Sequence, residues 1–324
     1  MSRTTVAVLM VAYNHEKYIR DAIEGVLMQR GNFDLRLVIG EDCGTDRTRS
    51  ICEEYATRHP DVVKLLPSEK NHGVLDNVLR VLRVCLQSDY IAICEGDDKW
   101  IDAGKLQHQV DFLVAHPEYD AHSHNVIVRD LMTGAERDFG ALWSGDLSLD
   151  ALFNSWPCHA VSQTIRSAVL CPVVDLKLPH FISADRFINR WIACHGRMYY
   201  DGERKMAVYH RHDTGASQTS NRHELCYQEY DMLESLCPFV PAARAPVFYK
   251  AKANAIRELA LSVAYARGPR RHQIAPMLAE YVALSRLRSL QDVYFFFILL
   301  LGRPFYLLNE FFRGRDPRRG ARQL

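Results

Sequence analysis

The first 115 residues contain four short apolar segments, and a helical pattern of apolar residues follows each one. The segments span residues 6–12, 35–39, 62–66 and 90–94, and the helical patterns span 19–27, 45–59, 74–86 and 105–115. Strands that alternate with helices in this way are typical of βαβ units, which build a mostly parallel sheet. The continuous apolar run of residues 6–12 favours a strand buried on both faces. The sequence therefore predicts an α/β fold with helices on both sides of a sheet.

The rest of the chain divides into a mixed part and a helical part. Strand candidates span 124–128, 160–165 and 206–209, and a helix is expected at 184–194. From about residue 222 to 312 the pattern is nearly all helical, with several prolines between the helices. We therefore expect one α/β domain over residues 1–220 and a helical C-terminal region over 221–324.

Charge and cysteine content exclude some classes of protein. Forty basic residues stand against 39 acidic ones, and a net charge of +1 argues against a general nucleic-acid binder. The nine cysteines include no CxxC pair, so reduced thiols are expected rather than disulfides or a zinc ribbon. Reduced thiols and the lack of a signal-peptide pattern before residue 6 favour a cytoplasmic location.

Polar clusters follow three of the four predicted strands. They are Tyr13-Asn14, Glu41-Asp42 and the run Glu95-Gly96-Asp97-Asp98. In open α/β sheets ligands bind outside the carboxyl ends of the strands, where these clusters would meet. Neighbouring carboxylates suit Mg²⁺ or Mn²⁺, and a glycine between them would let the backbone pass close to a ligand. Solvated loop charges and helix caps are the alternative.

Several common catalytic signatures do not occur in the sequence. The chain has no GxGxxG after its first predicted strand and no GxxxxGK[ST], so dinucleotide-binding and P-loop sites lack their glycines. It also has no GxSxG and no HExxH, which removes the common hydrolase and zinc-protease patterns.

Three stretches of the sequence resemble the family 2 glycosyltransferases, which have the GT-A fold. They are VAVLMVAYNHEKYIRDAIEGVLMQ, GEDCGTDRT, and YIAICEGDDKW with the following KLQHQVDFL. The resemblance is strong over residues 5–115 and looser to about 217. It implies that EGDD is the metal-binding motif, with Asp97 as the direct ligand. Glu95 and Asp98 would then surround the metal, the ribose and the pyrophosphate, although the first motif position is Glu rather than Asp.

The same resemblance implies a nucleotide pocket. Asp42 matches the family aspartate that accepts a hydrogen bond from the nucleotide base, and Tyr13 matches a residue packing near that base. Asn71, Gly73 and Asn77 fall where the family often lines this pocket.

Asp185 and His212 complete the candidate site. Asp185 lies in HFISADRFINRWIACHG, after Ser183 as a possible N-cap, and an acid in a first helical turn also offsets the helix dipole. The resemblance implies instead that Asp185 is the catalytic base. In MAVYHRHDTGAS, His212 matches a family histidine, which implies a metal or pyrophosphate contact, whereas His210 stands where arginine is usual.

These assignments imply an inverting, metal-dependent transferase. Mn²⁺ or Mg²⁺ is the expected cofactor. The expected donor is a nucleotide-sugar, and the resemblance favours a UDP-sugar because it is the commonest donor in the family. The expected acceptor is a saccharide or a lipid-linked chain. The expected role is synthesis of bacterial cell-surface polysaccharide or lipopolysaccharide. A nucleotide-sugar- or carbohydrate-binding protein without turnover is the alternative. A membrane scaffold would leave the acids at the strand ends unexplained.

The C-terminal segment is both apolar and basic. Residues 293–301 read VYFFFILLL, and residues 313–322 carry five arginines and one aspartate. Nine unbroken apolar residues are about half of the ~20 that span a bilayer. Aromatic residues beside a basic cluster favour a segment lying in the membrane interface, with a buried core helix as the alternative. We therefore expect residues 292–324 to contact the inner face of the cell membrane peripherally.

Overall fold

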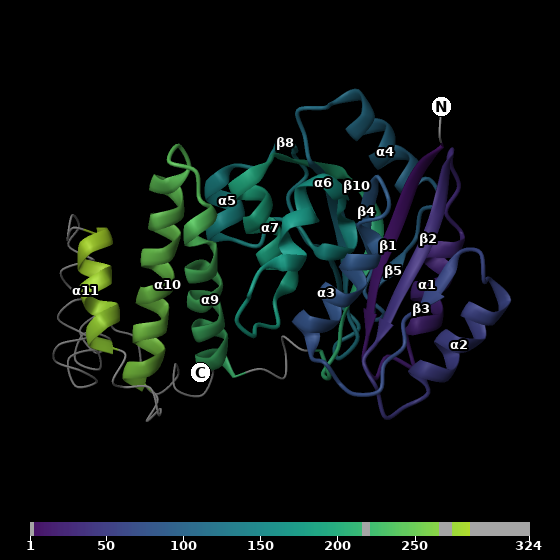
Figure 1. Ribbon diagram of the computed structural model, residues 1–324, viewed down its shortest axis with the longest axis horizontal. Helices are drawn as coiled ribbons and strands as arrows, with labels where there is room; N and C mark the ends of the chain where they lie inside the picture. Colours follow the sequence, from purple (N-terminus) through teal and green to yellow (C-terminus); the bar gives the residue numbers. More distant parts are fainter. Residues whose placement is uncertain (1–2, 216–220, 266–273, 286–324) are drawn as a thin grey trace. The chain divides into compact units, whose positions relative to one another are not determined.

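The computed structural model describes residues 3–215, 221–265 and 274–285. Contacts divide the chain into two units, Met1–Thr219 and Ser220–Leu324. The first unit contains the sheet and the second contains helices (Figure 1). That the first unit alone carries the catalytic site stays a prediction.

A single mixed sheet forms the centre of the first unit. Along its main path the strands lie in the order β3-β2-β1-β4-β9-β6-β10-β5, and β7 and β8 pair with β6 and β10. The strands are β1 (Thr4–Ala12), β2 (Phe33–Glu41), β3 (Val63–Leu65), β4 (Tyr90–Ile93), β5 (Lys99–Trp100), β6 (Ala121–Asp130), β7 (Glu136–Asp138), β8 (Ser144–Asp146), β9 (Thr164–Arg166) and β10 (Met198–Arg211). The pairs β1–β2, β1–β4 and β2–β3 are parallel, whereas β9 is antiparallel to both β4 and β6. The α/β fold is therefore confirmed.

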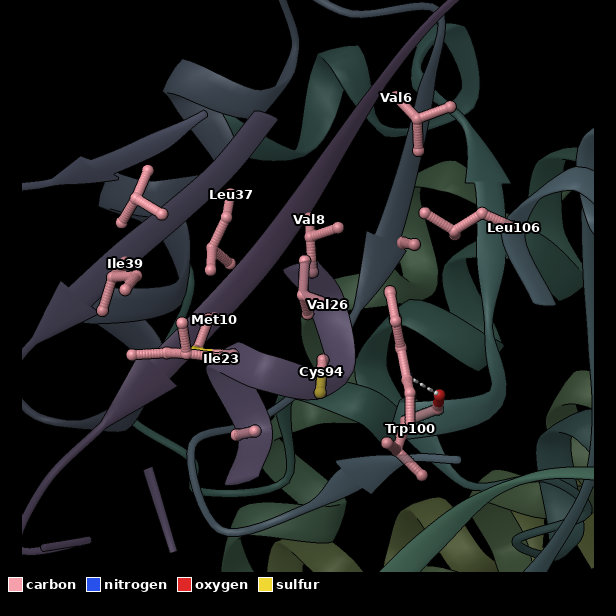
Figure 2. Close-up of a cluster of buried hydrophobic side chains, with 14 of the residues drawn as sticks. Val6, Val8, Met10, Ile23, Val26, Leu37, Ile39, Cys94, Trp100 and Leu106 are labelled. Carbon is pink, nitrogen blue, oxygen red and sulfur yellow. Dashed lines mark hydrogen bonds between the residues drawn. The ribbon is translucent and has the colours of Figure 1, made fainter. Parts of the chain in front are cut away.

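Helices cover both faces of the sheet. They are α1 (Ile19–Leu27), α2 (Thr48–Arg58), α3 (Val74–Cys85), α4 (Lys105–Ala115), α5 (Leu149–Asn154), α6 (Ser167–Leu170) and α7 (Ala184–His195). One core contains Val8 of β1, Val26 of α1 and Leu106 of α4 (Figure 2). Ile51 of α2 belongs to the same core. Helix α3 contacts β1, β2 and α7 outside that core. The alternate side chains of β1 thus pack on opposite helical layers, because strand residues alternate in direction.

Three details differ from the sequence prediction. The segment 160–165 is not one strand, because Ala160–Ser162 forms a 3-10 turn before β9. Helix α2 begins at Thr48 rather than after Thr45, and Asp46 accepts hydrogen bonds from the Thr48 amide and hydroxyl at its start. Strand β10 is 14 residues long, which is far longer than the predicted 206–209.

The second unit contains three described helices, α9 (Arg222–Leu236), α10 (Ala245–Tyr265) and α11 (Ile274–Ser285), and a 3-10 turn at Cys237–Phe239. Tyr227, Ile256, Leu259 and Tyr281 form its buried cluster. The buried Lys252 ammonium pairs with Glu234 and Glu280, which compensates the cost of taking its charge out of water.

Within the described ranges, no helix combines the length and the apolar character that a membrane span needs. The predicted membrane contact, residues 292–324, lies outside those ranges.

Candidate functional site

The ends of β1 and β2 lie side by side and turn sharply into their loops. Ala12 pairs with Glu41 in the register of these strands, and the Asp42 amide donates to the Ala12 carbonyl at 2.9 Å. Asn14 and Cys43 both have positive φ, at 56° and 54°, which is uncommon outside glycine. The parallel register therefore brings two predicted polar clusters to one edge of the sheet.

Two side chains, the buried Glu41 and the exposed Asn14, hold these loops in place. The Glu41 carboxylate accepts hydrogen bonds from the amides of Cys43 (3.2 Å) and Gly44 (2.6 Å). The Asn14 side-chain oxygen accepts one from the Thr45 amide at 2.7 Å. A side chain at Gly44 would meet Asn14 Oδ1 and Glu41 Oε1 within 3 Å, so this position needs glycine.

Asp42 organises the loop before α3. Its two oxygens accept hydrogen bonds from the amides of His72 (2.8 Å) and Gly73 (2.9 Å), and Asn71 Oδ1 also accepts from the Gly73 amide. Gly73 has a φ of +83°, a conformation that favours glycine. The structure thus brings Asp42, Asn71 and Gly73 together, in keeping with a pocket at the β2 end.

Tyr13 and Asn77 differ in how accessible they are. The Tyr13 ring is 45% exposed next to the Asp42 loop and is free to contact a ligand. Asn77 is only 2% exposed, and its amide donates to the Gly40 carbonyl of β2 at 2.7 Å. Asn77 therefore supports the strand that presents Asp42, and its predicted contact with the nucleotide stays a prediction.

The carboxylates of Glu95, Asp97 and Asp98 gather just after β4. An oxygen from each lies within 4.8 Å of the others. Gly96 sits between them, and a Cβ there would meet Ala12, Ile19 and His15 at 2.9–3.0 Å. The glycine is thus required by packing against β1 and α1, which is a different reason from the close ligand approach expected from sequence.

Two histidines face Asp97. His212 Nε2 lies 3.0 Å and His15 Nε2 lies 3.6 Å from Asp97 Oδ2. Burial alone would raise the pKa of Asp97, but the two imidazoles outweigh it and lower that pKa to about 2. Asp97 is therefore an anion at neutral pH, as a metal ligand must be. His212, which the sequence analysis placed in the site, therefore contacts Asp97, the predicted metal-binding residue, directly.

The other two carboxyls resist ionisation. Burial, together with the negative charges of Asp97 and Asp185, raises the pKa of Glu95 to about 8. Burial and the charges of Asp97 and Glu95 also raise the pKa of Asp98. Asp98 accepts a hydrogen bond from the His210 amide at Oδ1, but its buried Oδ2 has no hydrogen-bond partner among the residues described. A bound cation would compensate this concentration of acids.

Asp185 lies in the first turn of α7 and within the electrostatic reach of Glu95 and Asp98. Burial raises its pKa, while hydrogen bonds from the Arg186 backbone and the Trp156 indole lower it in part. Ser183 does precede the helix, but its side chain makes no capping hydrogen bond. A carboxylate with a raised pKa beside the acidic cluster fits a proton acceptor better than a simple helix-dipole partner.

A second histidine cluster does not offer the lone pairs that a metal needs. His108, His122 and Asp201 bring their polar atoms within 4.8 Å of one another. The Gln109 amide nitrogen, which can only donate, lies 3.0 Å from His122 Nδ1. His122 Nε2 must then carry the proton, and Arg204 already pairs with Asp201 at 3.3 Å. We assign this cluster a structural role between α4, β6 and β10.

Sequence reasoning missed several residues around the acids. His15 follows the Tyr13-Asn14 turn, and His159 approaches Asp98 Oδ2 at 3.8 Å from a segment 61 positions away. Trp156, in the loop after α5, is among the groups that lower the pKa of Asp185. Single histidines and tryptophans carry no spacing signal, so only the folded chain brings them to the site.

Comparisons with known proteins find similarity to part of this chain. Residues 7–138 match the family model "Glycosyl transferase family 2". An uncharacterized protein of Mycobacterium tuberculosis is 38% identical over 148 residues, 45% of this chain and 42% of that protein. The dTDP-rhamnosyl transferase RfbG of Shigella flexneri is 33% identical over 121 residues, 36% and 41% of the two chains. The putative teichuronic acid biosynthesis glycosyltransferase TuaG of Bacillus subtilis is 31% identical over 109 residues, 34% and 42% of the two chains.

Solved structures extend the likeness beyond this segment. Residues 1–349 of TarS from S. aureus, in complex with UDP-GlcNAc, superpose with a TM-score of 0.58 at 13% identity, covering 97% of this chain and 93% of that one. The mannosyltransferase PcManGT of Pyrobaculum calidifontis, in complex with GDP-Man and Mn²⁺, gives a TM-score of 0.53 at 17% identity and covers 93% and 85%.

The aligned segments cover less than half the length of the curated relatives. The segment matched by the family model, residues 7–138, includes the ends of β1, β2 and β4, where the acids gather. Residues 7–138 of this chain are therefore similar to glycosyl transferase family 2, and its first unit has the GT-A fold.

Proposed function

We propose that this chain is an inverting, metal-dependent glycosyltransferase that moves a sugar from a UDP-linked donor to a saccharide or lipid-linked acceptor. The observation that carries the proposal is the gathering of Glu95, Asp97 and Asp98 within 4.8 Å at the end of β4. The candidate nucleotide loop of Asp42 lies on one side of this cluster along the sheet edge, and Asp185 is close enough to raise the pKa of Glu95.

The residues present fit a divalent cation. Oxygen ligands of this kind suit Mn²⁺ or Mg²⁺, and the buried Asp98 Oδ2 has no hydrogen-bond partner in the described part of the chain. Asp97 would hold the ion directly. Asp98 and His212 both lie next to Asp97. A cation there would supply positive charge against the departing diphosphate.

The protein's own groups would carry out a single displacement. Asp185 accepts the proton of the acceptor hydroxyl while that oxygen attacks the anomeric carbon. The new carbon–oxygen bond forms on the face opposite the bond to the diphosphate, which breaks and leaves with its electron pair as the nucleoside diphosphate. Attack from the opposite face inverts the anomeric configuration. The Asp42 loop holds the nucleotide throughout, so the reacting atoms stay aligned.

Names of the relatives support the chemistry and its setting. RfbG is a dTDP-rhamnosyl transferase, TuaG is assigned to teichuronic acid biosynthesis, and the TarS and PcManGT structures hold a nucleotide-sugar. We propose that this chain likewise works in the synthesis of a bacterial surface polysaccharide, on the cytoplasmic side of the membrane.

Release of nucleoside diphosphate tests the proposal. The full chain is incubated with Mn²⁺, a panel of UDP-, GDP- and dTDP-sugars, and octyl glycosides as acceptors. We expect one donor–acceptor pair to release the diphosphate steadily, and proton NMR of the product to show the inverted anomer. A protein that binds donors but yields no product under any pairing is the non-catalytic binder instead.

The role of Asp42 can be measured by calorimetry. Asp42→Ala should weaken UDP binding at least tenfold, because loss of two hydrogen bonds to a carboxylate releases the 71–73 loop and removes the proposed acceptor for the base. Asp130→Ala is the matched control, since Asp130 accepts from two backbone amides in the turn after β6. Thermal unfolding of both variants separates binding from folding. Equal UDP affinity of Asp42→Ala and the unaltered chain would remove Asp42 from the pocket.

The C-terminal sequence supports a second proposal, that residues 292–324 dock the enzyme on an anionic membrane surface. Each arginine near such a surface contributes about 1 kcal/mol at low salt. The full chain should therefore float with anionic liposomes, whereas a chain ending at Leu290 should not, and added salt should weaken the flotation. If both chains float equally, or neither does, the segment does not bind the membrane.

A further inference from the structure

His212, beside the proposed metal site, has a polar partner at each of its ring nitrogens. Its Nε2 lies 3.0 Å from Asp97 Oδ2, and its Nδ1 lies 2.9 Å from the hydroxyl oxygen of Thr214. The His212 ring is buried, and the Tyr18 ring packs on it with centroids 4.9 Å apart and planes tilted by 32°. His212 is therefore held by packing on its face and by a polar group at each end.

His15, the other imidazole near Asp97, lacks such a pair of partners. Its Nε2 is 3.6 Å from the same carboxylate oxygen, which is longer than a hydrogen bond. Its buried Nδ1 has no hydrogen-bond partner anywhere in the described segments. Histidines that bind metals almost always hydrogen-bond a protein group or water through the nitrogen that does not bind the metal. His212 is therefore suited to hold a cation next to Asp97, and His15 is not.

The two partners of His212 determine where its proton lies. An ionised carboxylate only accepts hydrogen bonds, so a direct bond to Asp97 requires the proton on Nε2. In a neutral imidazole Nδ1 then has a free lone pair and accepts from the Thr214 hydroxyl. A cation bound at Nε2 needs the lone pair of that nitrogen, so the ring proton must then lie on Nδ1. The Thr214 hydroxyl can serve both arrangements, because a hydroxyl donates or accepts according to how it turns.

We propose that Thr214 is a positioning residue that lets His212 exchange its bond to Asp97 for a bond to the metal ion. When the ion binds, Nε2 loses its proton to water and Nδ1 takes one up from water, so the imidazole stays neutral. Thr214 is exposed, and water can therefore reach this end of the ring. The Thr214 hydroxyl turns from donor to acceptor and keeps the ring in place. This inference rests on the proposed metal-dependent function and adds the residue that supports one of the metal ligands.

Binding of Mn²⁺ tests this role without turnover. Thr214→Val removes the hydroxyl and should weaken Mn²⁺ binding roughly tenfold or more, the usual loss when the partner of a metal-binding histidine is removed. Thr214→Ser keeps the hydroxyl and should bind Mn²⁺ within about threefold of the unaltered chain. Thr133→Val is the matched control and should bind normally, because the exposed Thr133 hydroxyl also accepts a hydrogen bond in a turn. Electron paramagnetic resonance of free Mn²⁺ measures each affinity, with and without UDP.

Nitrogen NMR tests the movement of the proton itself. Isotope-labelled histidine distinguishes protonated from unprotonated ring nitrogens, and the chain with His212→Gln identifies the signals of His212 by their loss. At about pH 8, where imidazoles are ordinarily neutral, the proton should lie on Nε2, and Zn²⁺, a diamagnetic probe, should move it to Nδ1. A proton that stays on the same nitrogen with and without Zn²⁺ would overturn the exchange.

The outcomes separate the role of Thr214 from the function on which it rests. If the unaltered chain binds no Mn²⁺, with or without UDP, or if Asp97→Ala binds it as tightly, the proposed metal site fails and the role of Thr214 with it. If Asp97→Ala loses the ion but Thr214→Val binds it as tightly as the unaltered chain, only the role of Thr214 is overturned. An equal loss in Thr214→Ser would also overturn that role, because the hydroxyl is retained. Should Thr214→Val fail to fold in thermal unfolding, the position of the His212 proton decides.

Discussion

Asp97→Ala should lower sugar transfer by about 10³-fold or more while the protein stays folded. The two imidazoles of His15 and His212 hold this carboxylate ionised, with a pKa of about 2. It is thus the one member of the acidic cluster that offers a full negative charge to a cation at neutral pH without first losing a proton. Its removal takes away the proposed direct ligand and leaves Glu95 and Asp98, whose raised pKa values oppose ionisation.

Metal-dependent binding is the measurement that isolates this role. UDP titrations by calorimetry, with and without Mn²⁺, should show tighter binding with the ion for the unaltered chain and no such gain for Asp97→Ala. Asp97→Asn keeps the volume and a hydrogen-bonding side chain toward His212, so it should lose the same gain with less disturbance of the fold. Asp102→Ala is the control, because Asp102 is an exposed acid in the loop between β5 and α4. Its carboxylate accepts a hydrogen bond from the Gly104 amide. Full turnover in EDTA, or an active Asp97→Ala enzyme, would falsify the metal role.

Residue patterns predicted the part of the fold that depends on local periodicity. The buried runs became β1, β2, β3 and β4, and the helical patterns after them became α1 to α4, with shifts of a few residues at their ends. Because parallel strands end at the same edge, the positions of Asp42 and of the acids after β4 followed from the strand assignment alone. The distance between Asp42 and the acids after β4 is set by the register of the strands, in which β1 pairs with β2 on one side and with β4 on the other.

The half of the sheet beyond β4 depends on long-range pairing that periodicity does not record. Strand β9 inserts antiparallel between β4 and β6, and its hydrogen bonds are to residues more than 40 positions away. Strand β10 continues through polar residues such as Asp201 and Lys205 that interrupt an apolar pattern, and two register shifts accompany them. His212 reaches Asp97 only because β10 pairs with β5 and β6. The family resemblance could therefore place His212 in the site, whereas the spacing of residues in the sequence could not.

Burial explains why the candidate base was the most ambiguous residue in the sequence. An acid in the first turn of a helix has an ordinary role near the positive end of the helix dipole, and Glu224 occupies that position on α9. What distinguishes Asp185 is its surroundings: a half-buried site, the Trp156 indole, and the nearby acids after β4. These surroundings come from the packing of α7 against α3, α5 and α6, which no local pattern encodes.

Asp185→Asn should therefore reduce kcat by about 10²-fold or more, the usual scale for a lost general base, with donor KM and Mn²⁺ dependence retained. The asparagine side chain keeps the size of aspartate and can still form hydrogen bonds, while the proton acceptor is lost. Glu224→Gln, which alters a first-turn acid in the other unit, should leave kcat unchanged. Initial rates of diphosphate release, with UDP affinity measured in parallel, check both variants. If Asp185→Asn turns over at the normal rate, the carboxylate only stabilises the start of α7, and the acceptor proton must leave by another group.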